Sequence, residues 1–232
     1  MKYWKQFWPL YILTAVIFTL IAFGAEKTVA TIAESRPVPR EHTIIIDAGH
    51  GGIDGGATSC SGVLESQINL MIAKKLNDLC HLLGFSTFMI RTDDVSVYTE
   101  GATIAAKKAS DLRNRVKMVN DTENGILISI HQNSFADSRY SGAQVFYAAT
   151  PGSELLAKYM QDAFVSTVNK GSNRHSKPAE QVYLMRHIQR TGILIECGFL
   201  SNPEEEAKLR SQEYQNMLCC VIVGALCEYL AT

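Results

Sequence analysis

From residue 43 onward, short apolar segments alternate with longer stretches that repeat hydrophobic residues at helical spacing. This alternation constrains the fold more than any other feature of the sequence. Three of the short segments, Thr43–Asp47 (TIIID), Gly125–Ile130 and Ile193–Cys197, are almost entirely apolar. Such runs are typical of strands that are covered on both faces of a sheet. The sequence therefore predicts a single α/β domain over residues 43–232, in which a mostly parallel or mixed central sheet lies between helices in three layers.

The remaining elements of this domain follow from periodicity and from capping residues. Further strands are predicted at Ser86–Ile90 and Ala143–Ala148. A proline at the first turn and an Asn-Pro pair followed by acidic residues are typical of helix starts. Helices are therefore predicted at 65–83, at 111–120, from Thr150-Pro151 to about 168, from Asn202-Pro203 onward, and at 214–229.

The predicted helix 111–120 carries two kinds of side chain. Spacing places its apolar residues on an inward face, and its basic residues are expected to face solvent or a partner. The apolar residues are Leu112, Val116 and Val119, and the basic ones are Arg113, Arg115 and Lys117.

The N-terminus precedes this domain with a different composition. No charged residue occurs from Gln6 to Ala25, and Lys2 and Lys5 stand before this run. About 20 apolar residues match the thickness of a bilayer, and basic residues before them favour a cytoplasmic N-terminus and export of the rest. Residues 1–25 are therefore predicted to be a signal peptide or a signal anchor. The lack of a clean A-x-A site after the run favours the anchor. Residues 26–42, with two prolines, are predicted to be a linker.

Charge and cysteine content narrow the class of function. A formal net charge of -1 argues against a nucleic-acid partner, because such proteins usually carry a basic face. The six cysteines include no C-x-x-C pair, which argues against a thiolate zinc site. Most of them are expected to be reduced, buried apolar residues.

Three apolar strands lead directly to residues that can bind a metal or move a proton. They lead to His50, His131 and Glu196 respectively. Functional side chains of open α/β sheets gather at the carboxyl ends of the strands, so these three are expected to meet at one edge of the sheet. A fourth candidate, Glu65, begins the helix that follows the glycine-rich loop around His50.

These four side chains match the needs of a catalytic zinc site. Two histidines and a carboxylate hold such an ion and leave a position for water. A second carboxylate can then take a proton from that water and deliver one to the leaving group. Residue types and spacing leave open which glutamate has which role.

The same residues are compatible with other interpretations. A histidine after a strand is commonly a hydrogen-bonded core residue, and Glu196 could be a paired structural carboxylate. The glycine loop could be a phosphate-binding loop, but it lacks the GK[ST] ending and the G-x-G-x-x-G spacing. A serine triad is disfavoured because no G-x-S-x-G segment occurs.

Four motifs in this order resemble the zinc-dependent N-acetylmuramoyl-L-alanine amidases whose catalytic domain is one α/β unit. The motifs are IDAGHGGIDGGA (Ile46–Ala57), VLES with Glu65, SIHQNS (Ser129–Ser134) and IECGFLSN (Ile195–Asn202). The resemblance implies that His50, Glu65 and His131 bind one Zn²⁺ and that Glu196 is the catalytic glutamate. It also implies that Gln132, Asn133 and Leu184 line the substrate site. The chain departs from the family motifs at two positions: a small residue is common where this chain has Gln132, and Cys197 follows the catalytic glutamate. The implied reaction removes stem peptides from peptidoglycan by hydrolysis of the amide between N-acetylmuramic acid and L-alanine.

Within that family, the sequence resembles the germination-specific amidases of spore-forming bacteria. The resemblance lies in Thr99–Asn120, Ser141–Tyr147 and Tyr183–Arg186, and in the order of membrane segment, linker and catalytic domain. It implies an exported enzyme on the outer face of a membrane, in the forespore intermembrane space or cortex, that prepares muramic-δ-lactam formation. No inserted segment between His131 and Glu196 resembles the inhibitory helix of divisome amidases. Control by an envelope protein or lipoprotein is therefore expected.

Two other functions are compatible with the same motifs. One is a zinc peptidase or deacetylase that acts on another amide of the cell wall. The other is a wall-binding domain without activity, which the complete set of four site residues disfavours.

Overall fold

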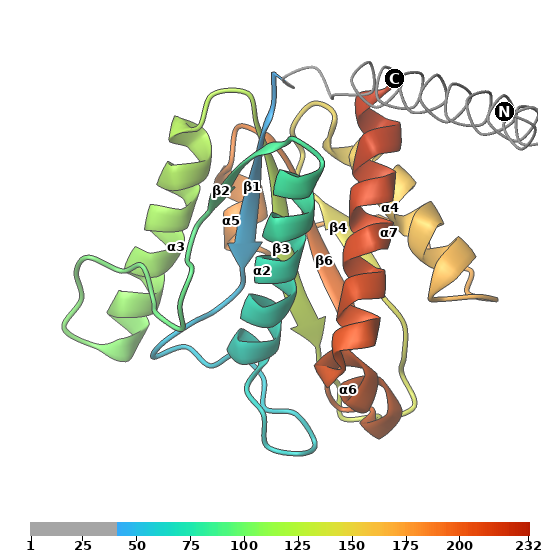
Figure 1. The fold of residues 1–232 in the computed structure, drawn as a ribbon. Coiled ribbons are helices and arrows are strands. Elements are labelled where there is room, and N and C mark those ends of the chain that lie inside the picture. The colour runs from blue at the N-terminus through green and yellow to red at the C-terminus, as the bar shows by residue number, and fades with distance from the viewer. Residues whose placement is uncertain (1–40) are drawn as a thin grey trace, which may run out of the picture. The chain divides into compact units, whose positions relative to one another are not determined.

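A mixed six-stranded sheet with the order β2-β1-β3-β6-β4-β5 forms the centre of the domain (Figure 1). The structure, a computed structural model, describes residues 41–232; the predicted membrane segment and nearly all of the predicted linker lie outside the described residues. The strands are β1 (Thr43–Ala48), β2 (Ser86–Met89), β3 (Gly125–Asn133), β4 (Gln144–Tyr147), β5 (Lys177–Pro178) and β6 (Thr191–Phe199).

Both faces of this sheet are buried, which explains the apolar runs in the sequence. Strands β2, β1, β3 and β6 are parallel, whereas β4 pairs with β6 in the antiparallel sense. Ile44 and Ile46 of β1 belong to one hydrophobic cluster and Ile45 to another, on opposite faces. Each face therefore needs its own layer of helices.

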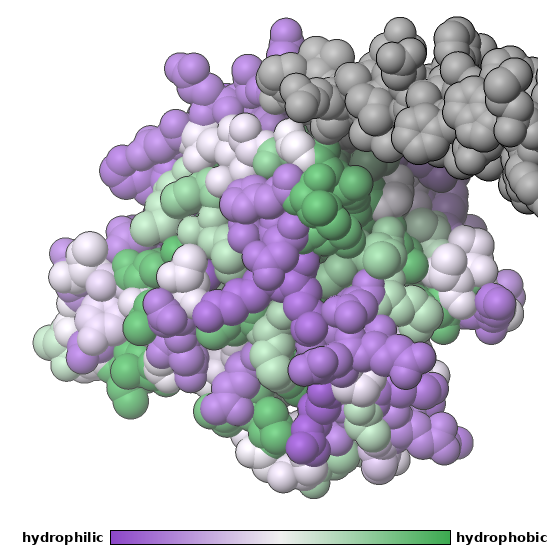
Figure 2. All heavy atoms as spheres, in the orientation of Figure 1, coloured by the Kyte–Doolittle hydropathy of each residue, from purple (hydrophilic) through white to green (hydrophobic). Residues whose placement is uncertain are grey.

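The helices supply these two layers, as Figure 1 shows. Helices α2, α4 and α7 pack together against one face, and α3 and α5 contact each other at the other. The outer surface of the α2 and α7 layer mixes hydrophilic and hydrophobic side chains (Figure 2). The helices are α2 (Glu65–Leu82), α3 (Ile104–Asp121), α4 (Ser153–Thr167), α5 (Tyr183–His187), α6 (Pro203–Arg210) and α7 (Gln212–Leu230). The predicted three-layer α/β domain is confirmed.

Several boundaries differ from the prediction for local reasons. Helix α3 begins seven residues before the predicted Asp111, because Thr103 Oγ1 accepts a hydrogen bond from the Ala106 N–H and caps the helix there. Helix α4 begins after Gly152, whose φ of 80° is left-handed. Elements β5 and α5 were not predicted, since two and five residues are too short to show periodicity.

The prediction for Arg115 is wrong. Arg113 and Lys117 are exposed as expected, but Arg115 is only 2% exposed. Its guanidinium forms ion pairs with Asp47 at the end of β1 and with Asp111 on its own helix. A buried carboxylate on β1 requires a cationic partner, and α3 supplies it.

Two further expectations concern membrane association and cysteines. Within residues 41–232, no helix combines the length and the hydrophobicity that crossing a bilayer requires. Cys80, Cys197 and Cys219 are buried, Cys227 is partly buried, and Cys60 and Cys220 are exposed. Three of the six cysteines are therefore buried, whereas most were expected to be.

Candidate metal centre and active site

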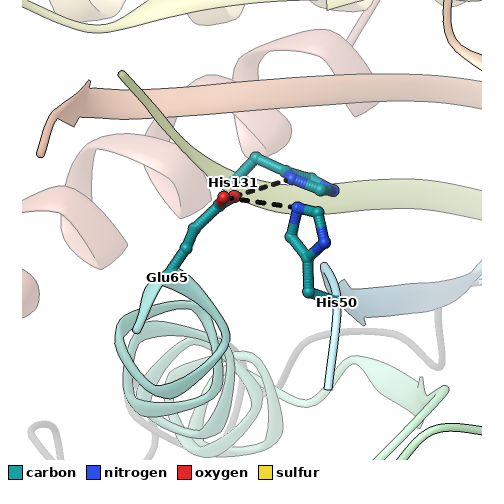
Figure 3. A group of neighbouring side chains, drawn as sticks. All are labelled: His50, Glu65 and His131. Atoms are coloured by element: carbon teal, nitrogen blue, oxygen red, sulfur yellow. Dashed lines mark hydrogen bonds and ion pairs between the residues drawn. The ribbon is translucent and has the colours of Figure 1, made fainter. Parts of the chain in front are cut away.

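Three side chains from separate elements meet at the carboxyl edge of the sheet (Figure 3). His50 lies in the loop after β1, Glu65 is the first residue of α2, and His131 lies within β3. Glu65 points between the two rings: its Oε2 is 3.3 Å from His50 Nε2, and its Oε1 is 3.0 Å from His131 Nδ1. One ligand atom from each residue lies within 4.8 Å of the others.

The backbone around His50 is shaped to bring this ring to the site. His50 has a φ of 61°, in the left-handed region that few residues other than glycine adopt. The guanidinium of Arg115 donates to the His50 carbonyl at 2.7 Å and holds this conformation. A Cβ on Gly49 would lie 2.2 Å from the His131 ring, so this position must be glycine for the ring to occupy its place.

The ion pair between Asp54 and Lys108 orients the His50 ring from the side opposite Glu65. Its Nδ1 lies 3.0 Å from Asp54 Oδ2, which leaves Nε2 directed at Glu65. Lys108 Nζ lies 2.7 Å from the other Asp54 oxygen. Sequence reasoning missed Asp54 and Lys108. The position of Asp54, four residues after His50 in the glycine loop, was the available signal for the first of them.

Glu65 is held by donors from three segments besides the two rings. Its Oε2 accepts the Ala57 N–H at 3.0 Å, and its Oε1 accepts the Gln132 N–H at 3.1 Å. The side-chain amide of Asn69 donates to Oε1 at 3.2 Å. The carboxylate is therefore fixed in place before any ligand binds.

Glu196 stands beside this cluster. It is directly opposite His131 in the pairing of β3 with β6. Its Oε2 is buried and has no hydrogen-bond partner among the described residues. Burial raises the pKa of Glu196 to about 7. A carboxyl group with this pKa can both accept and donate a proton near neutral pH.

A cavity of about 270 Å³ joins these groups and opens between the sheet edge and the α3 and α5 layer. Its lining includes His50, His131 and Glu196 together with apolar side chains, among them Leu184. Gln132 and Asn133, also predicted to line the substrate site, are not among its lining residues. Gln132 is buried behind Glu65, because alternate residues of a strand point to opposite faces.

The electrostatics of the cluster favour a bound cation. Burial opposes the charged form of His50, yet the hydrogen bonds and charges of Glu65 and Asp54 raise its pKa to about 9. Burial likewise opposes ionisation of Glu65, but the two histidines hold its pKa far below its usual value. The carboxylates thus attract positive charge to the point where the two rings converge. Two imidazole nitrogens and one carboxylate oxygen there can hold a divalent metal ion.

A buried ion pair lies beneath the site. Arg115 contacts Asp47, donates to Asp111 Oδ2 at 2.6 Å and donates to the Ala48 carbonyl at 3.1 Å. Burial would raise the pKa of Asp47, but Arg115 and the Ser129 hydroxyl hold it below its ordinary value. Together with the bond to the His50 carbonyl, these contacts connect α3 to the loop that carries His50.

Comparison with known proteins relates this geometry to a family. Residues 44–228 match the family described as N-acetylmuramoyl-L-alanine amidase. The germination-specific N-acetylmuramoyl-L-alanine amidase of Bacillus subtilis is 37% identical over 188 residues, which cover 80% of this chain and 78% of that relative.

Solved structures give the same result. The CwlD amidase of Clostridioides difficile, solved in complex with the GerS lipoprotein, is 38% identical with a TM-score of 0.78, over 82% of this chain and 98% of that one. The amidase AmiC2 of Nostoc punctiforme is 26% identical with a TM-score of 0.71, over 84% of this chain and 100% of that one. The family resemblance found in the motifs is confirmed. This chain belongs to the N-acetylmuramoyl-L-alanine amidase family, and its activity is hydrolysis of the amide between N-acetylmuramic acid and L-alanine in peptidoglycan.

Proposed function

We propose that this amidase is zinc-dependent, with His50, Glu65 and His131 holding one Zn²⁺ and Glu196 acting as general base and then general acid. The observation that carries the proposal is the convergence of three ligand atoms within 4.8 Å beside a buried carboxylate oxygen that has no partner among the described residues. All but Glu65 line the same cavity, where a substrate amide can enter.

The residues present fit zinc in both donor type and support. Two histidines and one carboxylate with room for water form a common set for catalytic zinc. The Asp54 carboxylate beside His50 Nδ1 is the outer contact that a zinc-binding histidine usually makes. The absence of a side chain at Gly49 leaves space for the His131 ring.

The roles of the residues in the reaction follow from their positions. Zinc, when bound, would supply Lewis-acid chemistry and lower the pKa of bound water to about 7. Glu196 accepts a proton at its free Oε2 and returns it to the nitrogen of the departing L-alanine. The apolar walls around Leu184 limit access of bulk water to the carboxylate, which keeps its pKa near 7.

We also propose that the enzyme acts outside the cytoplasm, in the spore cortex. Residues 1–25 would attach it to a membrane, and a lipoprotein would control its activity. The name germination-specific of the B. subtilis relative supports the cortex setting, and the lipoprotein in the CwlD structure supports control by a lipoprotein. Digestion of purified cortex and vegetative peptidoglycan in parallel tests the setting, since a cortex enzyme should release more stem peptide from the former.

Removing the metal tests the central proposal. We expect dialysis against a chelator to abolish release of stem peptides and stoichiometric Zn²⁺ to restore it. Mass spectrometry should show the new carboxyl group on the muramic acid lactyl group and the free amine on L-alanine. Full activity of verified metal-free protein would contradict zinc dependence, and cleavage at a different amide would indicate a peptidase or deacetylase instead.

A methyl group at position 49 should weaken metal binding. Because the Cβ of a Gly49→Ala variant would lie 2.2 Å from the His131 ring, the ring must leave its present position beside Glu65. We expect the zinc dissociation constant, measured by competition with a chelating dye, to rise about 10–100-fold. Gly224→Ala, where a Cβ meets nothing within 4 Å, is the matched control and should bind zinc like the parent. Equal affinity in both variants would show that His131 does not bind the ion.

A further inference from the structure

A fully buried amide, Asn69, lies on the face of α2 that packs against the sheet. It follows Glu65 by one helical turn and stands between Ile68 and Ile72, which are also fully buried. Burying an amide costs free energy unless each of its polar atoms finds a partner. The contacts of Asn69 are therefore informative.

Asn69 contacts each of the three segments that carry the proposed zinc ligands. Its Nδ2 donates to Glu65 Oε1 at 3.2 Å and to the carbonyl of Gly49, the residue before His50, also at 3.2 Å. Its Oδ1 accepts from Nε2 of Gln132, the residue after His131, at 3.2 Å. One side chain thus connects the loop after β1, helix α2 and strand β3 immediately beside their ligands.

Gln132 completes this arrangement from the face of β3 that packs against α2. It is 3% exposed, and its backbone N–H donates to the same Glu65 oxygen that Asn69 contacts. Its Nε2 satisfies the amide oxygen of Asn69, so that the Asn69 Nδ2 remains directed at Glu65 and Gly49. The Gln132 side chain also lies near the buried Cys197 thiol, whose pKa is raised by burial and lowered in part by Gln132. The two residues that depart from the family motifs are therefore neighbours behind the metal centre.

We propose that Asn69 is a positioning residue that holds the three ligand-bearing segments in register for zinc, and that Gln132 acts through it. The inference rests on the proposed function, because it assumes that His50, Glu65 and His131 bind the ion. Without the Asn69 amide, Glu65 Oε1 loses a donor and the Gly49 carbonyl loses its direct connection to α2. The position of the carboxylate relative to the backbone beside His50 is then less tightly fixed.

The test compares zinc affinity with fold stability in Asn69→Ala and Ser66→Ala. Ser66 is equally buried on the same helix, but its hydroxyl has no partner among the described residues, which makes it the matched control. Zinc dissociation constants come from dye competition, and unfolding free energies of the metal-free proteins come from urea denaturation. We expect Asn69→Ala to bind zinc about 10–100-fold more weakly, and Ser66→Ala to bind like the parent.

A double-mutant cycle tests whether Gln132 acts through Asn69. Gln132→Ala alone should weaken zinc binding about fivefold, the equivalent of one neutral hydrogen bond. In the Asn69→Ala background the same change should have no further effect on the zinc dissociation constant. Additive effects would overturn the proposed route through Asn69.

The outcomes separate this inference from the proposed function. A parent protein that binds no zinc would overturn both. A parent that binds zinc together with an Asn69→Ala variant of equal affinity would overturn the positioning role alone. A variant that loses stability in the metal-free state but keeps its zinc affinity would also overturn it, since Asn69 would then be a structural residue. Should Asn69→Ala fail to fold, unchanged affinity in Gln132→Ala overturns the proposal.

Discussion

Replacing Glu196 by glutamine should lower kcat for release of stem peptides about 10²–10⁴-fold, the usual contribution of a general acid or base. Glutamine has the same shape and occupies the same place opposite His131, but it cannot accept a proton at Oε2. Initial rates on purified peptidoglycan, with products identified by mass, provide the measurement. Zinc content should equal that of the parent, because no proposed ligand changes.

Glu204→Gln is the matched control for this experiment. Glu204 is exposed in the first turn of α6 and does not line the site cavity. It should keep the parental kcat. If Glu196→Gln also kept it, Glu196 would not be the base, and if that variant lost its zinc, Glu196 would act as a ligand.

Replacing Arg115 by methionine should lower the free energy of unfolding by about 3–5 kcal/mol, because removing one partner leaves a buried charge uncompensated. Asp47 is 1% exposed, and its carboxylate would lose its ion pair while the Ala48 and His50 carbonyls lose a donor. Methionine fills a similar volume, so the effect reports mainly on charge. Since domains are typically stable by about 5–15 kcal/mol, urea denaturation of the metal-free protein should show a large shift in midpoint.

Arg113→Met separates this effect from the general loss of a positive charge on α3. Arg113 pairs with Glu100, and both side chains are more than half exposed. Exposed pairs contribute little, so the expected loss is at most about 1 kcal/mol. Similar losses in the two variants would contradict the importance of the buried pair.

The layers of this fold could be predicted because strands that are buried on both faces have continuously apolar sequences. The segments around Ile44–Ile46 and Ile126–Ile130 are apolar without alternation, and the long helices repeat at helical spacing. The ends of β3 and β6 were predicted too early: His131 interrupts the apolar pattern of β3, which continues to Asn133, and β6 continues past the predicted Cys197 to Phe199. Elements of two or five residues offered no period to detect.

Convergence of the candidate ligands was predictable for the same topological reason, and the contacts around them were not. Parallel strands bring their carboxyl ends together, so His50 and His131 were expected to be close. The pairing of Asp47 with Arg115 joins residues 68 positions apart, and nothing in either local sequence identifies the partner. Arg115 lies four residues before Val119, so helical spacing places both on the buried face of α3, and the charge of Arg115 led to the expectation that it faces solvent or a partner.

The topology also determines when the molecule becomes able to act. Strand β6 is the last strand along the chain, yet it lies in the interior of the sheet, and β4 is hydrogen-bonded only to β6 and β5 within the described residues. Until residues 191–199 are synthesised and inserted, the first three strands and the β4-β5 pair cannot join, and Glu196 is not in place. Completion of the sheet and arrival of the proposed catalytic carboxylate are therefore a single event. Under the proposed role of Glu196, a truncated product that ends before this strand should be unable to hydrolyse peptidoglycan and so should not endanger the envelope of the cell that made it.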